Sequence, residues 1–200
     1  MNERFYDLSK AAVRCVVRVL WRARAVGMEN VPATGPLIVA CNHVSYLDPP
    51  AMGCFCPRRI SYMAKKELFE VPVLGGVIRA LGAYAVDRQG SATAAIKRSL
   101  EVLQAGGAIG IFPEGTRNLT GTVAPQTGVA LLASLAGAPV VPACIRGSDR
   151  ARRFGRIEVA FGAPLTLPGG RKATRDDLAK FTAEIMRAID ALSESIGGDT

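Results

Sequence analysis

The sequence has a single histidine, few aromatic residues, no long apolar run and five cysteines without a C-x-x-C pair. One histidine excludes a site in which several histidines hold a metal ion, so any chemistry at His43 is acid–base or nucleophilic. The odd number of cysteines favours reduced, mostly buried thiols over a disulfide framework. We therefore expect a cytosolic protein with reduced thiols and no multi-histidine metal site.

The charge balance points to an anionic partner. The formal net charge is +8, which favours nucleic acid, an acidic membrane surface or a phosphorylated substrate. Aromatic residues make up 6% of the chain, and no basic run is interleaved with them, which argues against nucleic acid because single strands bind on stacking platforms. The sequence also lacks a run of about 18 uncharged apolar residues, so we expect no membrane-spanning helix.

The N-terminal segment has the pattern of an amphipathic helix. Within residues 7–26, Arg14, Arg18 and Arg22 recur every four residues and form one stripe. These arginines interrupt the apolar stretch, which excludes a secretory signal. Two interpretations stay open: a helix packed on the domain with a solvated basic stripe, or a helix in the membrane interface whose arginines meet anionic headgroups.

Short apolar runs and helical patterns alternate along the rest of the chain. Strands are expected at 37–41, 59–65, 83–86, 108–112, 138–147 and 156–162, and helices at 71–82, 91–105, 127–136 and from near Thr174, where Asp177 completes a capping box. Pro142 inside its strand predicts a sheet edge or a bulge. The alternation predicts an α/β domain with a mixed, largely parallel sheet.

The first chemical motif follows a strand directly. Asn42 and His43 come after the buried run that ends at Cys41, and Asp48 lies five residues on, before a proline. Asp48 is expected to cap the next helix. A loop that closes onto this helix start can also bring the carboxylate to the imidazole, leaving the other ring nitrogen as a base. Ser45 is expected to make a loop hydrogen bond.

The second motif is the segment 112–118, with the sequence FPEGTRN. Gly115 permits an unusual turn, and Glu114 and Arg117 project from the loop that it forms. The guanidinium of Arg117 has the fork geometry that suits a phosphate. The alternative is a surface turn with an ion pair between Glu114 and Arg117. Arg88, at the end of another strand, is a further phosphate ligand or a solvated side chain.

Together the motifs resemble those of the 1-acylglycerol-3-phosphate O-acyltransferase family, within the glycerolipid acyltransferases. That family carries N-H-x-x-x-x-D, a glycine-to-arginine block, F-P-E-G-T-R and an apolar block with a proline, in this order. The matching segments here are 42–48, 82–88, 112–117 and 141–144. The first and third are specific, and their occurrence in order is a strong signal.

The resemblance implies a role for each matching residue. His43 would be the general base and Asp48 its orienting partner. Arg88 would hold the phosphate of the acceptor. The acceptor site would be shaped by Glu114, Gly115, Thr116 and Arg117, and Pro142 would belong to the acyl-donor site or a pocket wall.

The resemblance also implies the reaction, which would need no metal ion and no bound cofactor. An acyl thioester, acyl-CoA or acyl carrier protein, would donate its chain to the hydroxyl of a lysophospholipid, with 1-acylglycerol-3-phosphate giving phosphatidic acid. Residues 1–26 would form the basic helix and 27–200 the acyltransferase domain, peripheral on the inner face of the cell membrane. The alternatives are another lyso-lipid acceptor, such as a lyso-ornithine lipid or a glycolipid precursor, and a non-catalytic membrane-binding protein of this fold.

One stretch departs from the family pattern. Family members often carry a basic residue soon after the third block, ahead of a helix that a glycine begins. Here Gln126 and Thr127 precede Gly128 instead. The acceptor preference implied by the resemblance is therefore open at this point.

Overall fold

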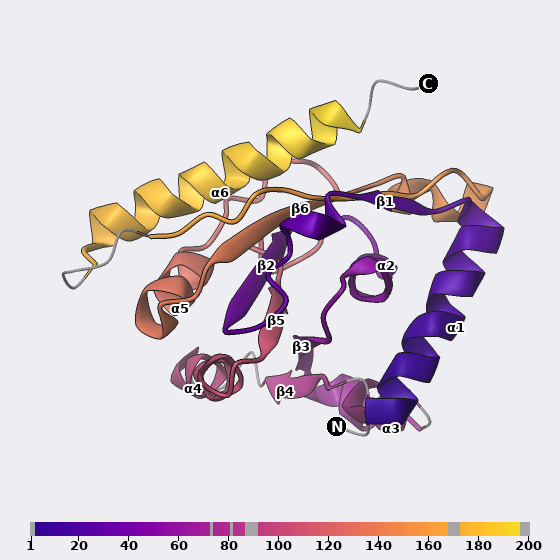
Figure 1. Ribbon diagram of the computed structural model, residues 1–200, viewed down its shortest axis with the longest axis horizontal. Helices are drawn as coiled ribbons and strands as arrows, with labels where there is room; N and C mark the ends of the chain where they lie inside the picture. The colour runs from indigo at the N-terminus through magenta and orange to yellow at the C-terminus, as the bar shows by residue number, and fades with distance from the viewer. Residues whose placement is uncertain (1–2, 73, 81, 87–91, 168–172, 197–200) are drawn as a thin grey trace.

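The computed structural model describes residues 3–72, 74–80, 82–86, 92–167 and 173–196. Their strands build one central sheet with helices on both sides (Figure 1). The strands are β1 (Arg24–Val26), β2 (Leu37–Cys41), β3 (Ile60–Lys65), β4 (Tyr84–Val86), β5 (Ala108–Ile111), β6 (Val140–Arg146) and β7 (Glu158–Phe161). The α-helices are α1 (Glu3–Trp21), α2 (Asp48–Phe55), α3 (Leu74–Ala80), α4 (Ala92–Gln104), α5 (Gly128–Ala136) and α6 (Arg175–Ser195).

The sheet has the order β1-β7-β6-β2-β5-β3-β4. Neighbouring strands run parallel, except that β6 and β7 are antiparallel. The predicted α/β fold with a mixed, largely parallel sheet and an N-terminal helix is thus confirmed. Because parallel strands end at the same edge, the segments that follow β2, β5 and β6 meet at one side of the sheet.

Strand β2 lies at the centre and is buried throughout, as its unbroken apolar run predicts. Leu37, Val39 and Cys41 face a core that includes residues of α1 and α2. Ile38 and Ala40 face a second core that residues of α4, α5 and α6 cover. With both faces filled, the end of β2 is a rigid support for the residues that follow.

Helix α1 begins and ends earlier in the chain than the predicted 7–26. It ends at Trp21, where Arg22 adopts a φ of 47° and the N–H of Ala23 donates to the carbonyl of Val17 (3.2 Å). Arg24–Val26 then form strand β1, which pairs with β7. The helical pattern across 22–26 was therefore misleading, because pairing with a distant strand overrides local propensity there.

Helix α1 packs on the domain, as the first interpretation of the sequence expected, but its basic stripe is not wholly solvated: Arg14 is half-buried against the domain, whereas Arg18 is exposed. The Nε of Arg14 donates to the carbonyl of Cys54 (2.7 Å), and the guanidinium of Arg18 lies 5.5 Å from the centre of the Phe55 ring. Lys10 donates to the carbonyl of Cys56. The end of α2 thus supplies both carbonyl and aromatic partners for the cations.

Apolar side chains occupy the outer side of α1 instead. Leu8 and Val19 are each 71% exposed, and Val16 is 49% exposed. No helix in the described ranges has the length and apolar composition that crossing a bilayer requires.

The expectation of a sheet edge at Pro142 is wrong, because β6 lies between β7 and β2. The missing N–H is tolerated because β7 ends beside it: Ala143 pairs with Phe161, the last residue of β7. Pro142 accepts a hydrogen bond from Gly162 (2.8 Å), and the nitrogen of a strand residue points to the same side as its carbonyl. The missing N–H of Pro142 therefore removes no hydrogen bond between β6 and β7.

Two smaller predictions are confirmed. Thr174 caps α6 and forms a capping box with Asp177. The five cysteines are free thiols, and four of them are buried, with Cys15 exposed.

Candidate active site

His43 and Asp48 form the contact predicted from their spacing. The Nδ1 of His43 lies 2.9 Å from Oδ2 of Asp48. Asp48 is fully buried and the imidazole is 16% exposed, so the pair lies at the floor of the site. Because a carboxylate only accepts, Nδ1 carries the proton. No hydrogen-bond partner within the described ranges contacts Nε2, whose lone pair is available as a base.

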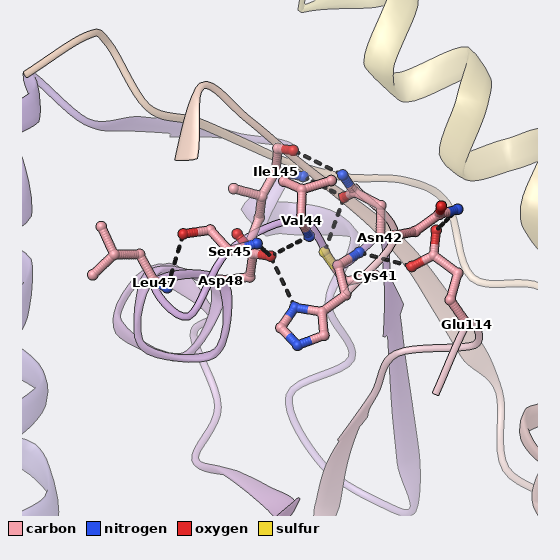
Figure 2. A network of polar contacts seen from close by, with 10 residues as sticks. Cys41, Asn42, Val44, Ser45, Leu47, Asp48, Glu114 and Ile145 are labelled. Atoms are coloured by element: carbon pink, nitrogen blue, oxygen red, sulfur yellow. Dashed lines mark hydrogen bonds and ion pairs between the residues drawn. The ribbon is translucent and has the colours of Figure 1, made fainter. Parts of the chain in front are cut away.

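The carboxylate of Asp48 also holds the loop that carries His43 (Figure 2). Its Oδ2 accepts from the backbone N–H groups of Val44 and Ser45, each at 2.7 Å. Asp48 is therefore not the expected cap: α2 begins at Asp48 itself after Leu47, and the carboxylate reaches backwards. Ser45 makes the expected loop hydrogen bond, since its Oγ accepts from Leu47 N–H (3.3 Å).

Glu114 connects the two motifs. Its Oε2 accepts from the backbone N–H of His43 (2.9 Å), and its Oε1 accepts from Nδ2 of Asn118 (3.1 Å). The residue is 6% exposed, and burial raises the pKa of its carboxyl, opposed by the hydrogen bonds from Asn118 and His43. The buried carboxylate of Glu114 therefore holds the backbone of His43 in place. The structure does not show the alternative, a surface ion pair between Glu114 and Arg117.

Two aromatic rings form a stack with the imidazole of His43. The ring of Phe112 stacks on that of His43 with centroids 4.2 Å apart, and Tyr62 stacks on Phe112 at 6.4 Å. Gly110 leaves space for this arrangement, because a Cβ there would lie 2.4 Å from the Tyr62 ring. The stack limits the orientations that the imidazole can take.

The loop of the second motif turns at Gly115, whose φ is 67° as its sequence position predicted. Thr116 is exposed at the loop surface. Arg117 is half-buried, with its guanidinium 3.8 Å from the centroid of the Tyr46 ring. This stacking orients the guanidinium and leaves its N–H groups without a hydrogen-bond acceptor among the described residues. Arg117 is thus prepared to bind an anion.

Two of the predicted residues are not part of the group described above. Arg88 lies outside the described residues. Pro142 is buried within β6, and a Cβ on Gly162 would touch both Pro142 and Leu192 of α6. It therefore packs on the side of the sheet that α6 covers, whereas the rings of His43 and Phe112 stack beyond the end of β2.

Sequence reasoning missed two asparagines. Asn42 is bonded twice to Ile145 of β6: its Nδ2 donates to the carbonyl (2.9 Å) and its Oδ1 accepts from the N–H (2.8 Å), as Figure 2 shows. The backbone N–H of Asn118 donates to the carbonyl of His43 (2.7 Å). Both asparagines lie within the motif segments 42–48 and 112–118, and that position was the available signal. They tie the loop of His43 to β6 and to the second motif.

Comparison with known proteins gives a consistent family. The model of the acyltransferase family matches residues 22–146, which contain both motifs. A solved 1-acyl-sn-glycerophosphate acyltransferase from Thermotoga maritima superposes with a TM-score of 0.69 at 24% identity, over 96% of this chain and 84% of that chain. This similarity shows that the two proteins share a fold.

Two relatives extend the comparison. The 1-acyl-sn-glycerol-3-phosphate acyltransferase of Bacillus subtilis is 30% identical over 96% of this chain and 98% of its own length. A chloroplastic enzyme of that name from Brassica napus is 30% identical over 62% of this chain, which spans 37% of that longer protein. The chain therefore belongs to the acyltransferase family that includes the 1-acyl-sn-glycerol-3-phosphate acyltransferases, and it is an O-acyltransferase.

Proposed function

We propose that the protein transfers a fatty acyl group from a thioester, acyl-CoA or acyl carrier protein, to the hydroxyl of 1-acylglycerol-3-phosphate, giving phosphatidic acid. The observation that carries the proposal is the imidazole of His43, whose Nδ1 is held by buried Asp48 and whose Nε2 has no hydrogen-bond partner among the residues that the structure describes. The names of the relatives support the choice of acceptor.

The chemistry follows from this geometry. The hydroxyl of the acceptor gives its proton to Nε2 of His43 as its oxygen attacks the thioester carbonyl. The carbon–sulfur bond then breaks, and the thiolate takes the proton from the imidazolium. General-base catalysis of this kind contributes roughly 10²–10⁴-fold. Asp48 holds the tautomer and stabilises the imidazolium through its charge.

Arg117 is the proposed ligand of the acceptor phosphate. It belongs to the same loop as Glu114, which bonds the backbone of His43, and its guanidinium is oriented by Tyr46. In 1-acylglycerol-3-phosphate the reacting hydroxyl and the phosphate sit on adjacent carbons, so the base and the phosphate ligand must lie close together. Arg88 remains a proposed second ligand.

We also propose that α1 attaches the protein to an anionic membrane surface on the cytoplasmic side. The exposed apolar side of α1, formed by Phe5, Leu8, Val16, Val19 and Leu20, is the part of the helix available to enter the lipid interface. The net charge of +8 favours an anionic surface. Arg14 and Arg18 contact the end of α2, away from this apolar side.

The test measures thiol release from acyl-CoA and from acyl carrier protein, with and without lysophosphatidic acid, for wild type and His43→Ala. We expect release that depends on the acceptor and disappears in His43→Ala while the circular dichroism spectrum is retained. Arg117→Ala should raise the KM for the acceptor. Release without an acceptor, a panel in which another lyso-lipid is the better acceptor, or full activity of His43→Ala would contradict the proposal.

A further inference from the structure

A basic pocket lies beyond the carboxyl end of β6, apart from the loop of Arg117. Its volume is about 660 Å³. Four arginines line it, together with two acidic residues, and the charged set is Arg22, Arg146, Arg150, Arg156, Asp149 and Glu158. The arginines come from the end of α1, the end of β6, the short helix η3 (Ser148–Arg153) and the segment before β7, so only the folded chain assembles them.

The carboxylates in this basic pocket have cationic partners. Glu158 pairs with Arg24, which is not part of the pocket lining, at 3.0 Å. Asp149 lies 3.5 Å from Arg150. The lining therefore keeps an excess of positive charge, which attracts an anion.

The loop that carries the arginines is held in shape. Gly147 has a φ of 81°, and a Cβ there would lie 2.0 Å from the carbonyl oxygen of Arg156, so the two ends of the loop touch. The indole N–H of Trp21 donates to the carbonyl of Ala151 (2.7 Å), which ties the loop to the end of α1. These contacts fix the shape of the loop, so the pocket is formed by the fold itself.

The basic pocket adjoins the candidate active site. A second cavity of about 250 Å³ shares Arg146, Gly147 and Asp149 with it. The second cavity extends to Asn42 and Val44, on either side of His43, and to Asn118, whose N–H bonds the His43 carbonyl. The second cavity also reaches Ser193 of α6, and His43 is not among its lining residues, so it connects the arginines to the backbone around the base rather than to the imidazole itself.

We propose that the basic pocket binds the phosphate groups of the acyl donor, a phosphorylated pantetheine thioester; this inference rests on the proposed function. The acceptor phosphate must lie near the reacting hydroxyl, and Arg117 is its proposed ligand. In the donor, the long pantetheine arm separates the thioester from its phosphates. A set of arginines set back from His43 fits that spacing, and guanidinium groups are strong phosphate ligands.

The direct test measures binding of coenzyme A, 4′-phosphopantetheine and pantetheine by calorimetry. The variant is Arg150→Ala/Arg156→Ala, and the control Arg152→Ala/Arg153→Ala removes the same charge from the same loop outside the pocket. Each lost arginine should weaken coenzyme A binding about tenfold. Pantetheine binding should not change, and the control variant should bind coenzyme A as wild type does.

The three probes distinguish the source of the phosphate. Equal weakening of coenzyme A and 4′-phosphopantetheine assigns the pocket to the phosphate that both carriers share. Weakening of coenzyme A alone assigns it to the adenosine phosphates. Wild type that binds coenzyme A no better than pantetheine, or equal losses in variant and control, would overturn the inference.

A kinetic measurement separates this inference from the proposed function. The Arg150→Ala/Arg156→Ala variant should raise the KM for acyl-CoA and leave the KM for lysophosphatidic acid unchanged. A rise in the KM for lysophosphatidic acid alone, or loss of binding to anionic vesicles with an unchanged KM for acyl-CoA, would assign the arginines to lipid instead. Absence of acyl transfer by wild type would contradict the proposed function. The calorimetry would still show whether the basic pocket binds the phosphate groups of coenzyme A.

Discussion

At the scale of single residues, Asp48 combines an orienting role with an electrostatic one. Its Oδ2 accepts from the ring of His43 and from two backbone N–H groups, while its buried Oδ1 has no partner in the described part of the chain. Because two backbone N–H groups donate to Oδ2, a residue substituted for Asp48 must place an acceptor oxygen at that position. Asparagine can therefore keep the ring oriented without the charge.

We expect Asp48→Asn to lower kcat by roughly 10²–10⁴-fold, because the imidazolium loses its counter-charge. The amide NH₂ would occupy the buried position of Oδ1 without an acceptor, which should cost about 1–3 kcal/mol of stability. Steady-state kinetics and urea unfolding measure the two effects. A kcat close to wild type would show that the charge of Asp48 contributes nothing to catalysis.

Glu114 gives a second prediction at this scale, on pH. Burial raises the pKa of its carboxyl above the ordinary 4.5, so the folded chain binds this proton more tightly than the unfolded chain. The stability that this group contributes is therefore fully present below pH 4.5 and is lost as the pH rises through the raised value.

The comparison variant is Glu114→Gln, which cannot titrate. The unfolding free energy of wild type minus that of Glu114→Gln should fall as the pH rises above 4.5, and then level off. Urea titrations over a series of pH values measure this difference. A difference that stays constant or grows with pH would mean that burial does not control this carboxyl.

At the scale of elements, α1 is both a packing helix and the proposed membrane contact. Deleting residues 1–26 would not test the contact cleanly. The hydroxyl of Tyr6 accepts from Ile60 N–H (3.0 Å), and β1 is a strand of the sheet. Substitutions on the exposed side avoid this difficulty.

We expect Leu8→Ser/Val19→Ser to weaken co-sedimentation with anionic vesicles at least tenfold. Burying each apolar side chain contributes about 1.5–3 kcal/mol, and about 1.4 kcal/mol is a factor of ten in binding. The matched control is Leu135→Ser, which removes an exposed leucine (55%) from α5, on the other face of the sheet. Undiminished binding of the double variant would exclude α1 as the contact.

At the scale of the whole molecule, the two ends of the sheet have different tasks. The candidate site lies where β2 and β5 end. At the opposite, amino-terminal ends of these strands, Arg58 connects the two segments that lead into them. It donates to the carbonyls of Gly35 and Gly106, each at 2.7 Å. This arginine stabilises the fold far from the chemistry.

We expect Arg58→Ala to lower the unfolding free energy by about 2–4 kcal/mol, because two charge-assisted hydrogen bonds are lost. Each kcal/mol should lower Tm by about 2–4 °C for a chain of this size. Below the transition, kcat should equal that of wild type. Calorimetry and kinetics at a low temperature check both, and a large loss of kcat would contradict this division of tasks.

Much of the fold and part of the site could be predicted from the sequence. The unbroken apolar run of β2 predicted a buried strand, and the position of both motifs directly after predicted strands indicated that His43 and the second motif lie at strand ends. The spacing of His43 and Asp48 predicted their contact, although not that Asp48 would also bond Val44. The left-handed turn at Gly115 was predicted because few other residues adopt it.

By itself, the sequence determined which residue types carry the chemistry and on which strand ends they lie, because periodicity and turn residues act within a few positions of the chain. Only the tertiary structure decided the partner of each side chain. Glu114 turned inward to His43, Arg14 turned to the end of α2, and Arg22 joined Arg156 in one pocket. These outcomes depend on contacts between segments far apart in the chain, where burial and hydrogen bonding outweigh local propensity.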